Sequence, residues 1–241
     1  MKCSKVSSPT DRKVMIESTN TLIYLLKDRF SFIDEIHNSE KLNTKIVSLL
    51  FTSFSCFAVY GAIIGATNIH TPIQILASAI KLPALYLLTL IVCFPTLYIF
   101  NAFFGSRSSI RQHWAYLLSA ITVIAVLLCG FAPISLFFLL TVSDKFFFLL
   151  LNVTVFAITG TLGISFLYRT MRPTDIDDQS GNIKIRRNIL KFWLALYGFV
   201  GTQLGWTLRP FFGTGNTFEL FRPREGSFFT AIWESIHRIG F

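Results

Sequence analysis

The residues whose types and spacing could support specific binding lie near the C-terminal end of the chain. An apolar run ends at Leu208, and the stretch from Phe218 to Gly226 then reads FELFRPREG. Aromatic side chains that alternate with charges of both signs, next to the stiff Pro223, indicate a loop held in one conformation. Ion pairing and aromatic contact are the chemistry that such a loop can offer. We therefore predict a partner-binding surface that consists of Arg209, Glu219, Phe221, Arg222, Arg224 and Glu225.

Two interpretations of Arg209 stay open at this stage. Trp and Arg commonly anchor a helix end at the membrane surface, and the pair Trp206 and Arg209 fits that role. Alternatively, the glycines that follow allow the chain to fold back, so that Arg209 pairs with Glu219 or Glu225 and fixes the loop. Only the second interpretation accounts for the alternating stretch.

Other reactive residue types lack the neighbours that catalysis needs. Ser165 could be a nucleophile, but no apolar segment contains a histidine to activate it. Asp175, Asp177 and Asp178 could hold Mg²⁺, yet basic residues surround them, which favours simple charge balance. The four cysteines form no CxxC pair, and no two histidines have bis-histidine spacing. We predict no catalytic residue and no metal site. The sequence identifies no cofactor and favours a protein without enzymatic activity.

The composition is typical of a membrane protein. Hydrophobic residues make up 52% of the 241 residues and charged residues only 15%, with a mean hydropathy of +0.56. A soluble domain carries about 25% charged residues. The net charge of +9 could suggest nucleic acid, but the distribution of the basic residues fits membrane orientation better. We predict an all-α protein in the lipid bilayer, with no nucleic-acid partner.

Five apolar runs are long enough to cross a hydrocarbon core of about 30 Å. They cover residues 46–66, 82–104, 114–132, 146–168 and 189–208. Lys191, at the start of the fifth run, is the only charge among them and can extend to the interface. The third run continues without charge to Ser143. We expect a separate segment at the far interface after Ala132, with a re-entrant half-helix as the alternative.

Prolines and glycines predict the shape and packing of these helices. Pro83 is expected in the first turn of the second span, where it is tolerated, and Pro95 should kink its middle. Two sets of glycines predict close helix packing, by small-xxx-small spacing or by steps of three and four along one face. These are Gly61 and Gly65 in the first span, and Gly198, Gly201 and Gly205 in the fifth.

Polar segments with amphipathic helices flank the spans at both ends. Residues 1–45 contain apolar residues at helical spacing from Leu22 to Ile36, and a second such helix is predicted over 227–239. The first helix could lie in the membrane surface or pack on the protein's own loops, and the sequence does not separate these. We therefore divide the chain into an N-terminal segment (1–45), a transmembrane domain (46–208) and an outer segment (209–241).

The basic residues predict the orientation. With five spans and the N-terminus inside, sixteen of the 22 Lys and Arg residues fall on the inner side. Such a bias is typical of cytoplasmic segments. We predict a multi-pass protein with a cytoplasmic N-terminus, in a bacterial inner membrane or a thylakoid-type membrane.

Two stretches resemble known families. The kinked second span, KLPALYLLTLIVCFPTLYIFNAFFGS from Lys81 to Ser106, resembles a span of the Yip family, whose members have a polar N-terminal region and about five spans. This resemblance implies a role in membrane organisation or trafficking. The tail from Gly201 to Gly226 resembles an uncharacterised family of bacterial and plastid-type membrane proteins. The charged tail is not part of the Yip pattern, and no functional residue can be transferred.

Two functions are compatible with these observations. The first is a non-catalytic membrane scaffold or assembly factor, whose C-terminal surface binds another membrane protein or a second copy of the chain. The alternative is a protein that handles lipids or apolar cofactors, as transporter or enzyme, in a cavity between its proline-containing spans. A pore ranks third because no span shows a polar stripe.

Overall fold

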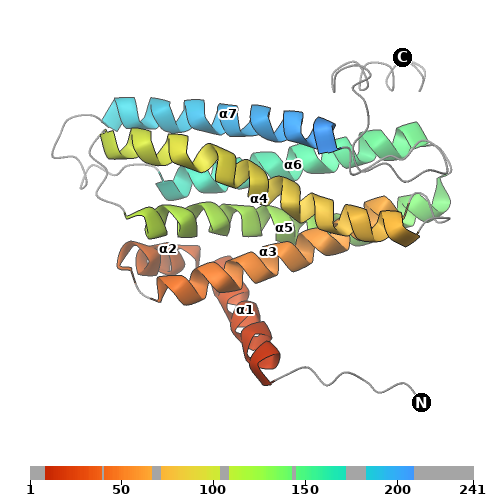
Figure 1. Cartoon of the computed structure of the whole chain (residues 1–241), viewed down its shortest axis with the longest axis horizontal. Coiled ribbons are helices and arrows are strands. Elements are labelled where there is room, and N and C mark those ends of the chain that lie inside the picture. Colours follow the sequence, from red (N-terminus) through yellow and green to blue (C-terminus); the bar gives the residue numbers. More distant parts are fainter. Residues whose placement is uncertain are drawn as a thin grey trace.

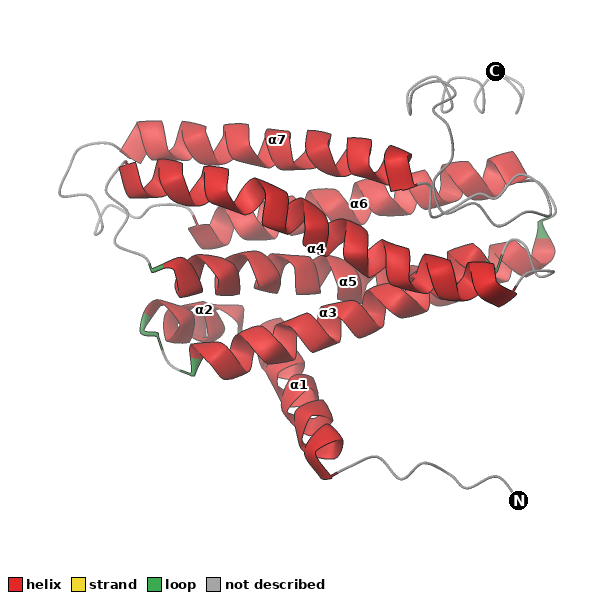
Figure 2. Cartoon of the chain, viewed as in Figure 1, coloured by secondary structure: helices red, strands yellow, loops and turns green. Residues whose placement is uncertain are grey.

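The computed structural model describes residues 9–39, 41–66, 72–103, 109–142, 145–171 and 183–208. Nearly all of these residues are helical, and no strand occurs among them, in agreement with the predicted all-α class (Figure 2). The helices in these ranges are α1 (Pro9–Lys27), α2 (Arg29–His37), α3 (Leu42–Gly65), α4 (Pro72–Phe103), α5 (Ile110–Thr141), α6 (Lys145–Met171) and α7 (Ile183–Leu208).

The five long helices, α3 to α7, lie side by side and alternate in direction along the long axis of the molecule (Figure 1). Helix α3 packs against α4 and α5, α6 packs against α5, and α7 packs against α4. Helix α7 is therefore joined to the rest of the bundle chiefly through α4. The short helix α2 lies at the end of the bundle where α3 and α5 begin, and α1 leaves the side of the bundle there.

Within the described ranges, four helices are long and apolar enough to cross a membrane, which is the pattern of a multi-pass membrane protein. The candidate spans are Leu42–Gly65, Ile73–Phe100, Ile110–Thr141 and Phe147–Met171. The predicted count of about five is not confirmed, because the fifth predicted span lies in α7, which is not among them. Lys191, Gln203 and the glycines of α7 make this helix less apolar than the others.

Two predicted helix boundaries are wrong. Helix α4 begins at Pro72, so Pro83 lies inside the helix together with Pro95 and not in a first turn. Helix α5 continues through Gly130 and Pro133 to Thr141, although a separate segment was expected after Ala132. The physical reason is the same in both cases. In an apolar environment a broken helix would expose unpaired backbone groups, so a proline is retained within a continuous helix.

The predicted N-terminal amphipathic helix over 22–36 is also wrong, because the chain breaks there into α1 and α2. Asp28 causes the break: its carboxylate accepts a hydrogen bond from the backbone N–H of Ser31 (3.2 Å) and caps α2. The break changes the helical phase. Phe32, which is fully buried, faces the bundle, whereas Phe30 is 73% exposed. Part of this segment thus packs on the protein itself.

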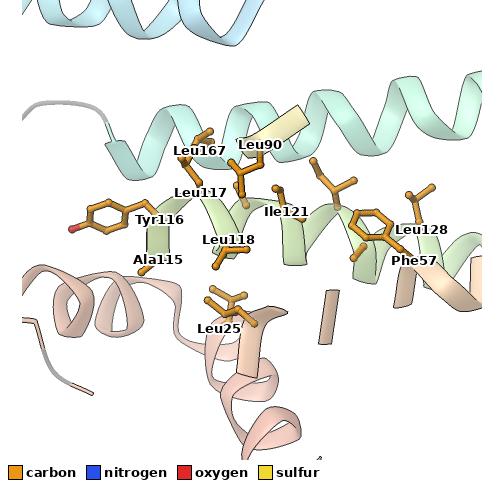
Figure 3. Packing of buried hydrophobic residues seen from close by; sticks show 14 of the residues in the cluster. Leu25, Phe57, Leu90, Ala115, Tyr116, Leu117, Leu118, Ile121, Leu128 and Leu167 are labelled. Carbon is orange, nitrogen blue, oxygen red and sulfur yellow. The ribbon is translucent and has the colours of Figure 1, made fainter. Parts of the chain in front are cut away.

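The core is centred on α5 (Figure 3). Every residue from Ala115 to Thr122 is buried, so this part of α5 is covered on all sides. Leu117 contributes from α5, Phe57 from α3, and Leu167 from α6. Large apolar side chains on the outer faces of the long helices remain exposed, as expected of helices that face lipid.

Candidate functional site

The predicted partner-binding surface lies outside the described residues. Its six residues, Arg209, Glu219, Phe221, Arg222, Arg224 and Glu225, all belong to residues 209–241. The C-terminal amphipathic helix predicted over 227–239 lies there as well. These assignments remain predictions. The structure describes the helix that precedes this surface, α7, and the way in which α7 is attached.

A buried tryptophan ties α7 to α4. Trp193, which is 1% exposed, donates a hydrogen bond from its indole Nε1 to the backbone carbonyl oxygen of Cys93 at 2.8 Å. Cys93 lies two residues before Pro95 in α4. One turn further along α7, the ring of Tyr197 stacks on Trp193 with a centroid separation of 5.4 Å. This bond between a side chain and a main chain fixes α7 along α4.

The two predicted glycine sets behave differently. A Cβ atom on Gly61 would lie 2.5 Å from the carbonyl oxygen of Ser78, and one on Gly65 would lie 2.9 Å from Cα of Ile75. The backbones of α3 and α4 therefore approach closely at these glycines. Contacts of this kind, within one chain, are what small residues permit in membrane helices.

The glycines of α7 permit no comparable approach. A Cβ atom would meet Thr89 at 3.7 Å from Gly201 and Leu85 at 3.6 Å from Gly205, both ordinary contacts, and it would meet nothing within 4 Å from Gly198. Gly201 and Gly205 thus face side chains of α4 at distances that a methyl group would fill without strain.

The centre of the bundle holds a polar network that joins three helices. Tyr60 on α3 donates from its phenol to Oδ1 of Asn152 on α6 (2.9 Å), and its oxygen lies 3.1 Å from Oγ of Ser135 on α5. Since the phenol has a single proton, Ser135 is the donor in the second bond. Asn152 also donates to the carbonyl of Phe148 in its own helix (2.7 Å). All of these side chains are buried, and they are mutually satisfied.

A second polar cluster holds α2 on the bundle. Lys45 of α3 forms an ion pair with Oε2 of Glu35, and Tyr24 donates to Oε1 of the same carboxylate at 2.8 Å. The hydrogen bonds from Lys45 and from Tyr24 hold the pKa of Glu35 below its ordinary value. The ammonium group of Lys45 also lies 5.0 Å from the ring centroid of Phe32.

The start of α5 reinforces this attachment. Gln112 forms a capping box with Ser109 and donates from Nε2 to the carbonyl oxygen of His37 (2.6 Å) and to Oγ of Ser39 (3.1 Å). Ser39 and Lys41 both have positive φ angles, so the connection between α2 and α3 is a tight turn. The end of α2 is thereby joined to α5 as well as to α3.

In the part of the chain that the structure describes, two buried polar atoms of α7 lack any such satisfaction: Nε of Arg187, in the first turns of the helix, and the phenol oxygen of Tyr197, near its middle. The phenol oxygen of Tyr197 is sealed from solvent and has no hydrogen-bond partner within the described ranges. It lies on the α4 side of α7, near Cys93 and close enough to the phenol of Tyr86 for electrostatic interaction. Tyr86 itself stacks on Phe57 of α3, with centroids 4.3 Å apart.

Sequence reasoning missed Tyr60, Ser135, Asn152, Gln112 and Tyr197 as significant residues. The signal available was their polarity within or beside the apolar runs, but the interpretation of those runs looked for charges, catalytic groups and polar stripes and not for hydrogen bonds between helices. Among the described residues, no three His, Cys, Asp or Glu side chains gather as a metal site would require. The aspartates at 175, 177 and 178 lie outside these residues.

Comparison with known proteins identifies no relative. No protein-family model, no curated protein and no solved structure matches the chain.

Proposed function

We propose that the chain is a non-catalytic membrane scaffold or assembly factor that binds another membrane protein, or a second copy of itself, through Arg209, Glu219, Phe221, Arg222, Arg224 and Glu225. The observation that carries the proposal is the bond from Trp193 to Cys93, which fixes α7 along α4. Arg209 directly follows the end of α7 in the sequence, so a fixed α7 gives the chain that enters this surface a fixed starting point. The resemblance of residues 81–106 to the Yip family supports the same role in membrane organisation.

The use of polar side chains within the bundle also supports a structural role. Tyr60, Ser135 and Asn152 bind one another across three helices. A network of this kind holds helices in register.

The proposal includes a topology in which α7 is the fifth crossing and the N-terminus is cytoplasmic. The alternation of α3 to α7 along one axis supports it, as does the concentration of basic residues in the predicted inner segments. A reporter inserted near residue 181 should then be cytoplasmic, and one fused after residue 241 should lie on the outer face. Signals from the same side would contradict this topology.

The binding role is tested by gentle solubilisation from native membranes, followed by identification of co-purifying protein. Arg222→Ala and Arg224→Ala should reduce recovery of a stoichiometric partner while the yield of folded protein stays constant. Lys145→Ala, which removes a basic residue from the start of α6, is the matched control. A monodisperse, partner-free wild-type chain would contradict the proposal.

A further inference from the structure

The unpartnered phenol of Tyr197 lies where an unmet hydrogen bond is costly. In the interior of a membrane no water is available to satisfy a buried polar group. An unpaired hydroxyl in an apolar environment is therefore destabilising, and proteins rarely retain one without a partner. The polar side chains of the central network, Tyr60, Ser135 and Asn152, have their partners inside the chain. Tyr197 does not.

The surroundings of Tyr197 are apolar and aromatic. Trp193 stacks on its ring, and Cys93 of α4 lies close to it. On the next turn, Gly201 faces the methyl group of Thr89, whose hydroxyl is already bonded to the carbonyl of Leu85 in its own helix (2.7 Å). The phenol is thus a hydrogen-bond donor set in an apolar seam between two helices.

Few backbone contacts hold the two sides of the seam together. Helix α7 touches the bundle mainly through α4, and its glycines make only ordinary contacts or none. Small separations of α7 from α4 therefore break few close contacts. The outer face of α7 carries exposed Phe192 and Phe199, so the helix presents apolar side chains to the bilayer beside the seam.

The position of Tyr197 selects the class of ligand. Tyr197 lies near the middle of α7, which runs from residue 183 to residue 208. In the proposed topology the apolar part of α7 begins at residue 189, and at about 1.5 Å per residue Tyr197 lies roughly 12 Å beyond that point, near the middle of a hydrocarbon core of about 30 Å. The ester carbonyls of phospholipids lie in the interfacial region, outside the hydrocarbon core. A neutral lipid whose carbonyl head dissolves in the bilayer interior, as a quinone does, can reach this depth.

We propose that the seam between α4 and α7 binds a membrane-dissolved quinone-class lipid, whose carbonyl oxygen accepts a hydrogen bond from Tyr197 and whose ring lies against Trp193. The phenol keeps its proton throughout, so the site binds its ligand without chemical change. This assigns a location and a ligand class to the lipid-handling function predicted from the sequence, and it stands independently of binding at the C-terminal surface.

The test uses the full chain in nanodiscs of a single phosphatidylcholine and titrates decylubiquinone against tryptophan fluorescence. Because quenching requires proximity, bound quinone should quench Trp193 saturably, and Trp193→Phe should remove most of that signal. Tyr197→Phe, which deletes only the hydroxyl, should weaken binding about fivefold to tenfold, as loss of one hydrogen bond predicts. Tyr98→Phe, on the far part of α4 where Tyr98 packs on His113, should bind like wild type.

Several outcomes would overturn the proposal. Non-saturable quenching, or equal affinity in Tyr197→Phe and wild type, would show that the phenol does not bind quinone. Native mass spectrometry separates the two sources of carbonyl: retention of phosphatidylcholine that depends on Tyr197, without quinone binding, would assign the site to an ester carbonyl and reject the quinone class. None of these results bears on partner recovery through Arg222 and Arg224.

Discussion

Helices α3 and α7 both pack along α4 and both carry glycines at their interface, yet the two interfaces differ in kind. At the α3–α4 interface, Gly61 and Gly65 bring backbone against backbone, and Phe57 stacks on Tyr86. At the α7–α4 interface the glycines leave space, and one hydrogen bond from Trp193 supplies the main specific contact. Glycine spacing alone therefore does not show close packing.

Whether a glycine can be replaced depends on the atoms that face it across the interface. Gly61 meets the backbone of Ser78, which cannot rotate away, so any side chain there must separate the helices. Gly163 of α6 faces the buried side chain of Ile124 on α5 at very short range, so a side chain there would have to displace a branched neighbour. The α3–α4 interface is thus closed by contacts with the backbone, whereas the α7–α4 interface is held by side-chain contacts and by the hydrogen bond of Trp193.

The sharpest test of this contrast adds one methyl group at a glycine of each interface. Gly61→Ala should destabilise the protein by about 1–3 kcal/mol, as overpacking does, because the carbonyl of Ser78 must move. Gly201→Ala should change stability little. Thermal unfolding in detergent measures both variants. Equal loss of stability in the two variants would mean that the α3–α4 and α7–α4 interfaces do not differ in this way.

A second test concerns the polar network of Tyr60, Ser135 and Asn152, which joins α3, α5 and α6. Asn152→Leu removes the acceptor for the phenol of Tyr60 and should cost about 1 kcal/mol, a typical value for a hydrogen bond between membrane helices. Thr154→Val, two residues away, is the control, since Thr154 is exposed and bonds only to its own helix. The same unfolding assay should separate the variants, and a neutral Asn152→Leu would show that the network contributes no stability.

The all-helical class and four of the spans follow from composition and run length, because each long uncharged segment has only one way to satisfy its backbone in lipid. Boundaries were less predictable. By the rules for soluble proteins, Pro83 and Pro133 were expected at helix ends, but both lie within continuous helices. The break at Asp28 was missed because the apolar spacing from Leu22 to Ile36 suggested one helix, while the cap depends on a local bond to Ser31.

The contacts that distinguish the two interfaces could not be predicted, since they join residues far apart in the chain. Tyr60 finds Asn152 and Ser135 only after three helices assemble. The glycines of α7 have the same spacing signature as Gly61 and Gly65, and only the position of α4 shows that they are loosely packed. The predicted surface after Arg209 lies outside the described residues, so its assignment still depends on sequence.

A third prediction concerns the hydrogen bond from Trp193 that attaches α7 to α4. Trp193→Phe keeps an aromatic ring but removes the donor to Cys93, which should raise amide exchange along α7 several-fold while α3 and α5 stay protected. Leucine at Phe192, which is exposed, is the control substitution. Hydrogen exchange followed by mass spectrometry resolves the helices. Uniform exposure of all helices would indicate that α7 unfolds with the bundle and is not separately attached.

The smallest expected effect lies at the attachment of α2, where the ion pair of Glu35 with Lys45 can be titrated. The pKa of Glu35 is lowered by the hydrogen bonds from Lys45 and Tyr24, so its contribution to stability is present above the ordinary value of 4.5 and is lost as the pH falls below it. Glu35 is more than a third exposed, so solvent screening limits this contribution to about 1 kcal/mol or less.

Exchange of the α2 amides should therefore be constant between pH 7 and pH 5, after correction for the intrinsic rate, and should increase as the pH falls below 4.5. Glu35→Gln should raise exchange already at pH 7 and flatten the dependence on pH. The hydrogen bonds from Ser31 lower the pKa of Asp28, which caps the same helix and also takes up a proton in acid, so the variant is compared with wild type at each pH. Asp34→Asn removes an exposed carboxylate from α2 without touching the ion pair and should keep the wild-type profile. If Glu35→Gln keeps it too, the bonds of Gln112 to His37 and Ser39 are sufficient to hold α2, and the ion pair adds no measurable stability.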